Sequence, residues 1–339
     1  MTIKDIAREC GCGVGTVSRV LNKRTDVSDQ MREKVLEVVN KYGFILNQNA
    51  KQLKELDRKT IVILVKGMSS LLFNALLEII QQKVQALSYT TSVVVLDEYD
   101  NEAKVACRLY YEQKPVGIIF LGGTPDTFKE DFAKIQSPCV LITNGAKYVN
   151  NALLSSITTD DIKASYDATS YLIRKGHKKI GVIGGDLKSS ELTKRRYRGF
   201  LKAMKEAGLA FNVKKNYSVS KYSFEGGEAA TGDLLEKYPD LTAIFTMSDV
   251  MAVGACRFLK NIGQSVPEDV SVTGFDGLSL ASYYCPKITT IKQLNDRLAI
   301  EGLDLLLKCI EKKEKAKHII LPFEFIEGES VKDLNPENL

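Results

Sequence analysis

The 339-residue chain is too long for one average domain and suits two or three. Its residues are 44% hydrophobic, 26% charged and 8% aromatic, which is typical of a soluble globular protein and excludes disordered, collagen-like and disulfide-scaffold classes. The first ten residues carry the charges of Lys4 and Asp5 and no apolar signal-peptide core, and the longest apolar stretches, such as 71–80, are far shorter than the roughly 20 residues that span a bilayer. We therefore expect a cytoplasmic protein that does not bind membranes.

The cysteines and histidines show no pattern of a metal or catalytic site. The seven cysteines are scattered and lack a CxxC pair, which favours reduced thiols over disulfides or zinc. The two histidines, His177 and His318, stand apart from any cysteine or histidine cluster and are expected to be structural or surface residues. The sequence therefore predicts no metal site, no cofactor and no catalytic residues.

Positive charge is concentrated near the N-terminus. The chain has a net charge of +5. Residues 1–60 contain 12 Lys and Arg against 8 Asp and Glu, a balance of +4, so the remaining 279 residues carry 35 against 34. A small basic head on a nearly neutral body indicates a polyanion-binding module joined to a larger unit.

The first sixty residues predict three short helices and no strand. Apolar residues recur at helical spacing in three groups, which are Ile3, Ile6 and Ala7, then Val17, Val20 and Leu21, then Met31, Val35, Val38, Val39 and Tyr42. Breaks fall at 11–13, at 22–25 and at Gly43, and Ser28 is a suitable N-cap for the third helix. The charged stretch 54–60 separates this pattern from the next, so we place a domain boundary there.

From Thr60 onward, short β-branched runs alternate with longer amphipathic segments. The predicted strands are Ile61–Val65, Val93–Leu96, Val116–Leu121, Val140–Thr143, Ile180–Ile183, Ala243–Thr246 and Val270–Gly274. The predicted helices are Leu71–Leu87, Ile162–Lys175, Glu191–Ala207, Glu225–Lys237, Val250–Ile262 and Gln293–Glu311. This alternation indicates two doubly wound parallel-sheet halves, with Leu153–Asp161 as a natural crossing between them.

The second predicted helix of the head has the pattern of a recognition helix. Its valines face inward, which leaves Gly15, Thr16, Ser18 and Arg19 on or near the outer face. Hydroxyls suit phosphates, arginine suits a guanine edge, and a helix N-terminus suits the DNA backbone. A plain three-helix domain with a solvated polar face is the alternative. A nucleotide-binding glycine loop is excluded, because no strand precedes Gly11 and the GxGxxG spacing fails at Thr16.

Three segments of the head resemble the DNA-binding head and hinge of the lactose/galactose repressor family of bacterial transcription regulators. They read TIKDIARECGCGVGTVSRVLN, VSDQMREKVLEVVNKYGF and LNQNAKQLK. The resemblance implies a helix-turn-helix DNA-binding domain over residues 1–46, a hinge helix and linker over 47–59, and an effector-binding and dimerisation domain over 60–339.

The family pattern also implies DNA contacts for individual residues. Those implied in the head are Val14, Gly15, Thr16, Ser18, Arg19 and Asn22, and those implied in the hinge are Asn47, Ala50 and Leu53. By resemblance, Leu53 is a wedge in the minor groove, with a linker residue as the alternative. Two positions depart from the family: Gly15 replaces a side chain that usually reaches the bases, and Leu46 stands where proline is common.

The body resembles the effector domain of the same family, which shares the fold of type I periplasmic sugar-binding proteins. The segments that carry the resemblance are 176–185, 196–209, 248–277 and 286–293. It implies Arg196 and Asp276 as the main polar contacts to a small molecule and Tyr222 as a stacking aromatic, with Phe73 and Asp160 as weaker candidates. Asp249 is either a ligand contact or the cap of the helix from Val250.

The basic run 194–198 allows two interpretations. It could bind an anionic effector such as a sugar phosphate. Alternatively, it is a solvated helix start with one functional arginine, and this is the interpretation that we favour.

The function that these features predict is a transcription regulator, most simply a repressor. It would bind a near-palindromic, double-stranded operator as a homodimer, under the control of a small molecule, expected to be a sugar. A solute-binding protein of the same body fold is the alternative, but it would lack the basic head. A sugar-handling enzyme comes third, because no catalytic constellation supports it.

Overall fold

The computed structural model describes residues 3–21, 24, 26–42, 59–67, 70–97, 100–129 and 132–335. The chain divides into two compact units, Met1–Arg58 and Lys59–Leu339, which are called the head and the body below. The predicted DNA contacts at Asn22, Asn47, Ala50 and Leu53 lie outside the described residues.

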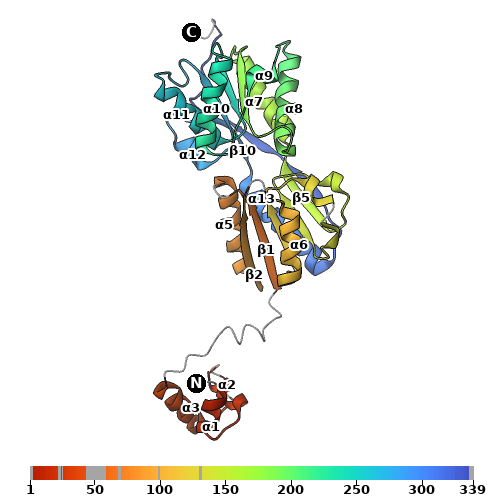
Figure 1. The fold of residues 1–339 in the computed structure, drawn as a ribbon, viewed down its shortest axis with the longest axis vertical. Helices are drawn as coiled ribbons and strands as arrows, with labels where there is room; N and C mark the ends of the chain where they lie inside the picture. The colour runs from red at the N-terminus through yellow and green to blue at the C-terminus, as the bar shows by residue number, and fades with distance from the viewer. Residues whose placement is uncertain are drawn as a thin grey trace. The chain divides into compact units, whose positions relative to one another are not determined.

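The head contains the three predicted helices, α1 (Ile3–Glu9), α2 (Val14–Leu21) and α3 (Asp29–Lys41) (Figure 1). Its core consists of the buried side chains Ile6, Ala7, Cys10, Val17, Val20 and Val35. Gly11 has a φ of +63° in the turn between α1 and α2, a backbone conformation that favours glycine. Ser28 precedes α3 as predicted, but its side chain makes no capping hydrogen bond.

The first half of the body is a parallel sheet with strand order β11-β5-β4-β3-β1-β2. The strands are β1 (Lys59–Lys66), β2 (Tyr89–Leu96), β3 (Gly117–Leu121), β4 (Cys139–Ile142), β5 (Leu154–Thr159) and β11 (His318–Leu321). Helices α5 (Leu71–Gln85) and α13 (Asn295–Lys312) pack in one core cluster. The second core cluster of this half is formed with helix α6 (Glu102–Gln113) and the short 3-10 helices η1 (Pro125–Lys129) and η2 (Phe132–Lys134). A further 3-10 helix, η3 (Lys147–Val149), follows β4.

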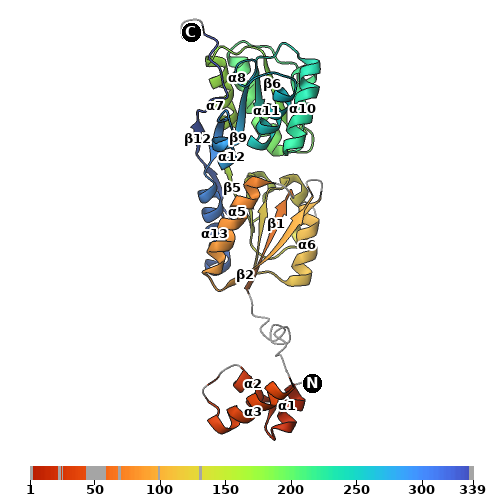
Figure 2. The same cartoon turned by 90° about the vertical axis from the view of Figure 1, so that its left-hand side faces the viewer.

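The second half is a sheet with strand order β12-β10-β9-β8-β6-β7, in which β12 alone is antiparallel to its neighbour. The strands are β6 (Ile180–Gly184), β7 (Tyr217–Val219), β8 (Ala243–Thr246), β9 (Ser271–Asp276), β10 (Thr289–Gln293) and β12 (Phe323–Ile326). The helices are α7 (Asp161–Arg174), α8 (Glu191–Glu206), α9 (Val213–Asn216), α10 (Phe224–Lys237), α11 (Asp249–Asn261) and α12 (Ser279–Tyr283). The pair α7 and α8 and the pair α10 and α11 cover opposite faces (Figures 1 and 2).

Three connections join the two halves of the body. They run from β5 to α7, from β10 to α13 and from β11 to β12. The first confirms the predicted crossing at Leu153–Asp161. At this junction the hydroxyl of Thr159 donates a hydrogen bond of 2.7 Å to Oε1 of Gln293, so the carboxyl ends of β5 and β10 meet.

Several elements were not predicted or were predicted too short. No periodicity in the sequence indicated α6 or the last two strands, and the strand predicted from Val93 begins at Tyr89. The additional residues Thr90, Thr91 and Ser92 are polar, but they pair with β1 in continuous register. Pairing with a neighbouring strand therefore overrides local polarity here. In the described part of the chain, no helix is both long and apolar enough to cross a membrane.

Candidate functional sites in the head and the body

Helix α2 has one buried and one accessible face. Val17 and Val20 are buried in the head core. The predicted DNA-contact residues of this helix face outward: Val14, Gly15 and Arg19 are exposed, and Thr16 and Ser18 are half-buried. The first turn of α2 contains no acidic residue, so no side-chain carboxylate there offsets the partial positive charge of the helix N-terminus. This face can therefore meet an anionic surface.

Among the described residues, the contact that holds the Arg19 side chain is an exposed ion pair. Its Nε lies 3.7 Å from Oδ2 of Asp26, and its side chain is 58% exposed. Such pairs contribute little to stability, so Arg19 can exchange this partner for a base edge.

Gly15 leaves a gap in the outer face of α2. A Cβ at this position would meet no atom within 4 Å, and its φ lies outside the left-handed region. The glycine is therefore not required by the packing of the head, and its absent side chain removes a potential base contact.

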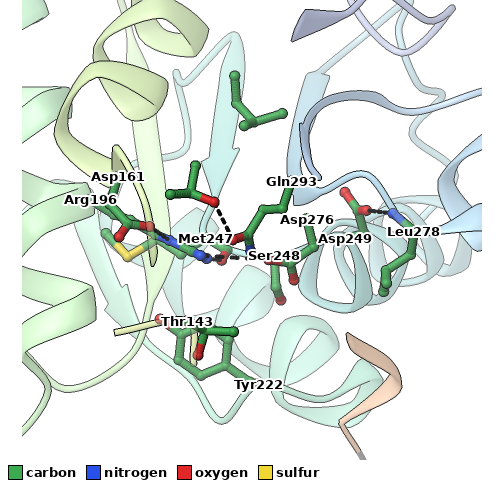
Figure 3. Close-up of polar contacts among 12 residues, drawn as sticks. Thr143, Asp161, Arg196, Tyr222, Met247, Ser248, Asp249, Asp276, Leu278 and Gln293 are labelled. Atoms are coloured by element: carbon green, nitrogen blue, oxygen red, sulfur yellow. Dashed lines mark hydrogen bonds and ion pairs between the residues drawn. The ribbon is translucent and has the colours of Figure 1, made fainter. Parts of the chain in front are cut away.

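In the body, Arg196 is the centre of a buried polar cluster where the strands of the second sheet end (Figure 3). Its Nε donates a hydrogen bond of 3.0 Å to Oδ1 of Asp161, and Nη2 lies 3.6 Å from Oδ1 of Asp276. Nη1 donates to the carbonyl oxygen of Met247. The guanidinium carbon lies 3.6 Å from the centre of the Phe275 ring. Two carboxylates and an aromatic face thus hold this cation rigidly.

Asp276 ends β9 and has a φ of +118°, which is unusual for a residue other than glycine. Nε2 of Gln293 donates a 2.8 Å hydrogen bond to its Oδ1. Burial raises the pKa of the Asp276 carboxyl to about 6, against the opposing effect of Arg196. The strained backbone and the raised pKa are both typical of functional sites.

Asp249 lies at the start of α11 and points toward α12 and β10. Its Oδ2 accepts a 2.7 Å hydrogen bond from the backbone N–H of Leu278, and its Oδ1 accepts one from the hydroxyl of Thr290. Burial, then the charge of Asp276, raises the pKa of the Asp249 carboxyl. The capping interpretation of Asp249 is wrong, because the cap of α11 is Ser248, whose hydroxyl accepts from the N–H of the third residue of the helix. The helix begins one residue earlier than predicted.

Of the buried side-chain oxygens that have no hydrogen-bond partner among the described residues, two bear on the proposed ligand site. They are Oδ2 of Asp161 and Oγ1 of Thr143, which follows β4 at the carboxyl edge of the first sheet with a φ of +81°. Leaving such groups unsatisfied costs about 1–3 kcal/mol each, so a bound donor or a water would stabilise both.

Tyr222 packs against the end of β6. Its hydroxyl lies 3.1 Å from Oγ1 of Thr193, the third residue of α8. A Cβ on Gly185 would lie 2.9 Å from the Tyr222 ring, so the glycine allows the ring to approach. Burial raises the pKa of the Tyr222 hydroxyl, whereas the charge of Arg196 lowers it.

The two weaker candidates occupy different surroundings. The ring of Phe73 packs over Gly122 at the carboxyl end of β3, and the side chain is half-buried. The Asp160 side chain is the N-cap of α7 and accepts a 3.2 Å hydrogen bond from the N–H of Lys163. Its neighbour Asp161, which was not predicted as a site residue, contacts Arg196 instead.

Sequence reasoning also missed Gln293 and Thr290. Both lie on β10, which was not predicted as a strand, although the segment 286–293 had been matched to the family. A signal did exist, because a polar residue at the end of a β-branched run, here Gln293 after Thr289–Ile291, often lies at a ligand-facing sheet edge.

Two other members of the basic run 194–198 are paired at the surface, whereas Nε of Arg195 is buried without a hydrogen-bond partner among the described residues. Lys194 and Arg198 both lie within 4 Å of Glu191, at 3.7 and 3.5 Å. These contacts fit the favoured interpretation of a solvated helix start with one buried arginine.

Comparison with known proteins places this geometry in a family. The model for bacterial regulatory proteins of the lacI family matches residues 2–47, and the model for the periplasmic binding protein-like domain matches residues 169–331. The chain is 34% identical to the HTH-type transcriptional regulator MalR of Clostridium butyricum, over 97% of this chain and 99% of that protein. The chain belongs to the lacI family of bacterial regulatory proteins. It is therefore a DNA-binding transcriptional regulator and not an enzyme.

Further relatives and solved structures are similar to this chain over most of its length. The HTH-type transcriptional repressor PurR of Vibrio vulnificus is 29% identical over 98% of this chain and 99% of that protein. A lac repressor dimer bound to operator and the anti-inducer ONPF has a TM-score of 0.74 at 24% identity, over 98% of this chain and 99% of that chain. A LacI family regulator from Enterococcus faecium with bound ribose has a TM-score of 0.71 at 25% identity, over 82% of this chain and 100% of that chain.

Proposed function

We propose that this lacI-family regulator is a cytoplasmic homodimer that binds a near-palindromic operator, and that a neutral sugar or sugar derivative controls its operator affinity. The observation that carries the effector assignment is the buried cluster of Arg196, Asp161 and Asp276. We place the effector between the two halves of the body, against this cluster and Tyr222.

The charges of the cluster favour a neutral ligand that is rich in hydrogen-bond donors. Two buried carboxylates, those of Asp161 and Asp276, lie against the guanidinium of Arg196, and a third, that of Asp249, lies near Asp276. One of the spare buried oxygens also belongs to a carboxylate, Oδ2 of Asp161. A phosphate would add negative charge to this site, whereas sugar hydroxyls can donate to the spare oxygens. The aromatic ring of Tyr222 offers a surface on which a sugar ring can stack.

The chain connections support a route from the effector to the head. Gln293 contacts both Asp276 in the second half and Thr159 at the end of the first half. A ligand held by Asp276 would therefore bias the junction about which the two halves move. The first half carries β1, whose first residue, Lys59, directly follows the head in the chain.

The names of similar proteins agree with this proposal. One similar structure is described with bound ribose and another, the regulator CelR, as a cellobiose complex. The lac repressor structure is described as a dimer bound to operator. These ligands and assemblies belong to those proteins and motivate the choice of compounds below.

A thermal-shift screen tests the effector class. We would compare neutral sugars, their phosphates and nucleobases, because a ligand of the native state raises its melting temperature. We expect a neutral sugar to give the largest shift and to change operator binding in a fluorescence anisotropy titration. A shift only with sugar phosphates or only with nucleobases would overturn the proposed class.

Two variants of α8 test the site itself. Arg196→Ala should abolish the shift and the operator response, whereas Arg198→Ala, which removes an exposed arginine from the same helix, should preserve both. Because Arg196→Ala could impair folding, Tyr222→Phe provides a milder test. It removes only the hydroxyl that contacts Thr193 and should raise the effector concentration needed for half-response. If Arg196→Ala and Tyr222→Phe both needed the same effector concentration for half-response as the parent, this site would be excluded.

A further inference from the structure

The amino edge of the first sheet, where the body joins the head, carries a group of exposed lysines. Helix α13 ends at Lys312 and β11 begins at His318, so the connecting residues lie where the parallel strands start. Lys59 begins β1 at the same edge. Figures 1 and 2 both show the blue end of α13 at the edge where β1 starts.

Three of these lysines, Lys312, Lys313 and Lys315, are exposed and form what we call the lysine ridge. Within the described part of the chain, none of the three lies within 4.0 Å of a carboxylate. The two acidic residues among them are engaged elsewhere: Glu311 accepts a 2.9 Å hydrogen bond from the Tyr89 hydroxyl, and Glu314 accepts one of 2.7 Å from Lys317. Glu314 also lies near Lys312, but the four lysines of 311–317 outnumber its two glutamates, so the ridge presents net positive charge to solvent.

The opposite edge of the same sheet carries several acidic residues, beside the basic residues Lys66, Lys147 and Arg297. Asp97 follows β2, Asp100 precedes α6, Asp126 lies in η1 after β3, and Asp296 lies in the first turn of α13. Helix dipoles explain part of this separation of charge, because they favour lysine at the C-terminus of a helix and aspartate at the N-terminus. That explanation does not extend to Lys315, which lies three residues beyond the end of α13.

We propose that the lysine ridge is a second, sequence-independent DNA-contact surface, which binds phosphates of the duplex that flanks the operator. The proposal rests on operator binding by the head. In the sheet order, β11 is four strands from β1, so at about 4.8 Å per strand the ridge lies roughly 20 Å from the point where the head joins the body. DNA bound by the head is thereby held at a high local concentration near the ridge.

The distribution of charge selects DNA over other partners. Regularly spaced phosphates attract exposed, unpaired lysines without any shaped pocket, and the gain comes from released counterions. The aspartates of the opposite edge would weaken an attraction to DNA, so among the described residues of the first sheet we assign this contact to the amino edge.

The test compares two triple variants of the full chain that have the same net charge. One carries Lys312→Gln, Lys313→Gln and Lys315→Gln. The control carries Lys205→Gln, Lys214→Gln and Lys215→Gln. These control lysines are exposed at the corresponding amino edge of the second sheet, Lys205 in the last turn of α8 and the other two in α9, just before β7. The carboxyl edges of the two sheets meet at Thr159 and Gln293, so the two triple substitutions lie at opposite ends of the body.

The probes contain a sequence that the parent chain selects from a random pool of duplexes. The short duplex has about 20 base pairs, and the long duplex has about 20 further base pairs on each side. On the long duplex, the ridge variant should bind roughly 3- to 30-fold more weakly, and its salt dependence should be shallower by about 1–3 in the slope of log K against log salt. On the short duplex it should match the parent. The control variant should match the parent on both, and all three proteins should have similar melting temperatures.

Each other result has a defined meaning. If the ridge variant and the control variant lost affinity equally, the loss would come from net charge alone, and the proposed DNA contact of the ridge would be overturned. Unchanged binding by the ridge variant, or an equal loss on the short and long duplexes, would also overturn the flanking contact. If the parent selected no sequence at all, the proposed operator binding would fail. The ridge would still be tested on random duplex of the longer length, because phosphate contacts do not depend on sequence.

Discussion

Arg196 and Asp161 form a buried ion pair across helices α7 and α8, with Nε of the arginine 3.0 Å from Oδ1 of the aspartate. Both side chains are at most 3% exposed. The pair connects the start of α7, which directly follows the crossing from the first half, to the polar cluster of the second half.

We expect Asp161→Ala to destabilise the body by about 3 kcal/mol, because it leaves a buried guanidinium with one carboxylate fewer. Asp160→Ala removes only a helix cap and should cost about 1 kcal/mol. Urea unfolding of the two variants measures both losses. Equal losses would contradict the assignment of the ion pair to Asp161.

The second prediction concerns the pH dependence of stability. Burial raises the pKa of Asp276 from its ordinary value of 3.8 to about 6. The groups that face this carboxyl are Arg196, Asp161, Asp249 and Gln293. Because the folded pKa lies above the unfolded one, the native state binds the proton more tightly. The resulting stabilisation is fully present below about pH 4 and is lost as the pH rises through about 6.

Melting curves of the parent and of Asp276→Asn between pH 4 and 7.5 would measure this loss. The stability of the parent relative to the variant should fall with rising pH, by an amount on the order of 3 kcal/mol. The carboxyl of Asp249 also has a raised pKa. The stability of the parent relative to Asp249→Asn should therefore also fall as the pH rises. A difference that does not change with pH would show that Asp276 does not titrate in this range.

The third prediction concerns base recognition by α2. Arg19→Ala should cost about 1–3 kcal/mol on the operator and far less on random DNA, because a bidentate contact to guanine is lost. Arg8→Ala removes the same charge from α1, where the side chain is 82% exposed, and serves as the control. Anisotropy titrations on both duplexes would compare them. An equal loss on operator and random DNA would reduce Arg19 to a phosphate contact.

The fourth prediction separates two glycines of the head. At both positions a Cβ would meet no atom within 4 Å, but only Gly11 has a positive φ, at +63°. Gly15→Ala should therefore stabilise the head by about 0.5–1 kcal/mol through helix propensity. Gly11→Ala should destabilise it by about 1 kcal/mol, because alanine disfavours the left-handed region. Hydrogen exchange of the α2 amides reports both changes, and changes of the same sign would show that φ does not decide the outcome.

The hinge prediction falls on residues that the structure does not describe, and it stays a prediction from sequence. If Leu53 unstacks a central base step, Leu53→Ala should weaken operator binding strongly and reduce the DNA bend, while non-specific binding stays the same. Leu46→Pro, which limits the conformations of the free hinge, should tighten operator binding modestly. Gel-shift measurements of affinity and bending test both variants. An operator bent equally by Leu53→Ala and the parent would exclude the wedge.

Much of the architecture could be predicted from the sequence, because it depends on local periodicity. The spacing of Val17 and Val20 placed the buried face of α2, and the β-branched runs located four of the six strands of the first sheet and three of the six of the second. Arg196 and Asp276 were identified from family motifs, and the structure brings these two side chains together, with 3.6 Å between Nη2 and Oδ1.

The tertiary structure alone decided which neighbours complete the cluster. Asp160 and Asp161 are adjacent and chemically identical, yet successive residues of a helix point about 100° apart. The rotation of α7 against α8 therefore directs Asp161 to Arg196 and leaves Asp160 to cap the helix. Gln293 joins Thr159 across 134 positions, a pairing that no local pattern contains. Periodicity specifies which face of an element is buried, whereas the packing of distant elements determines which polar groups meet there.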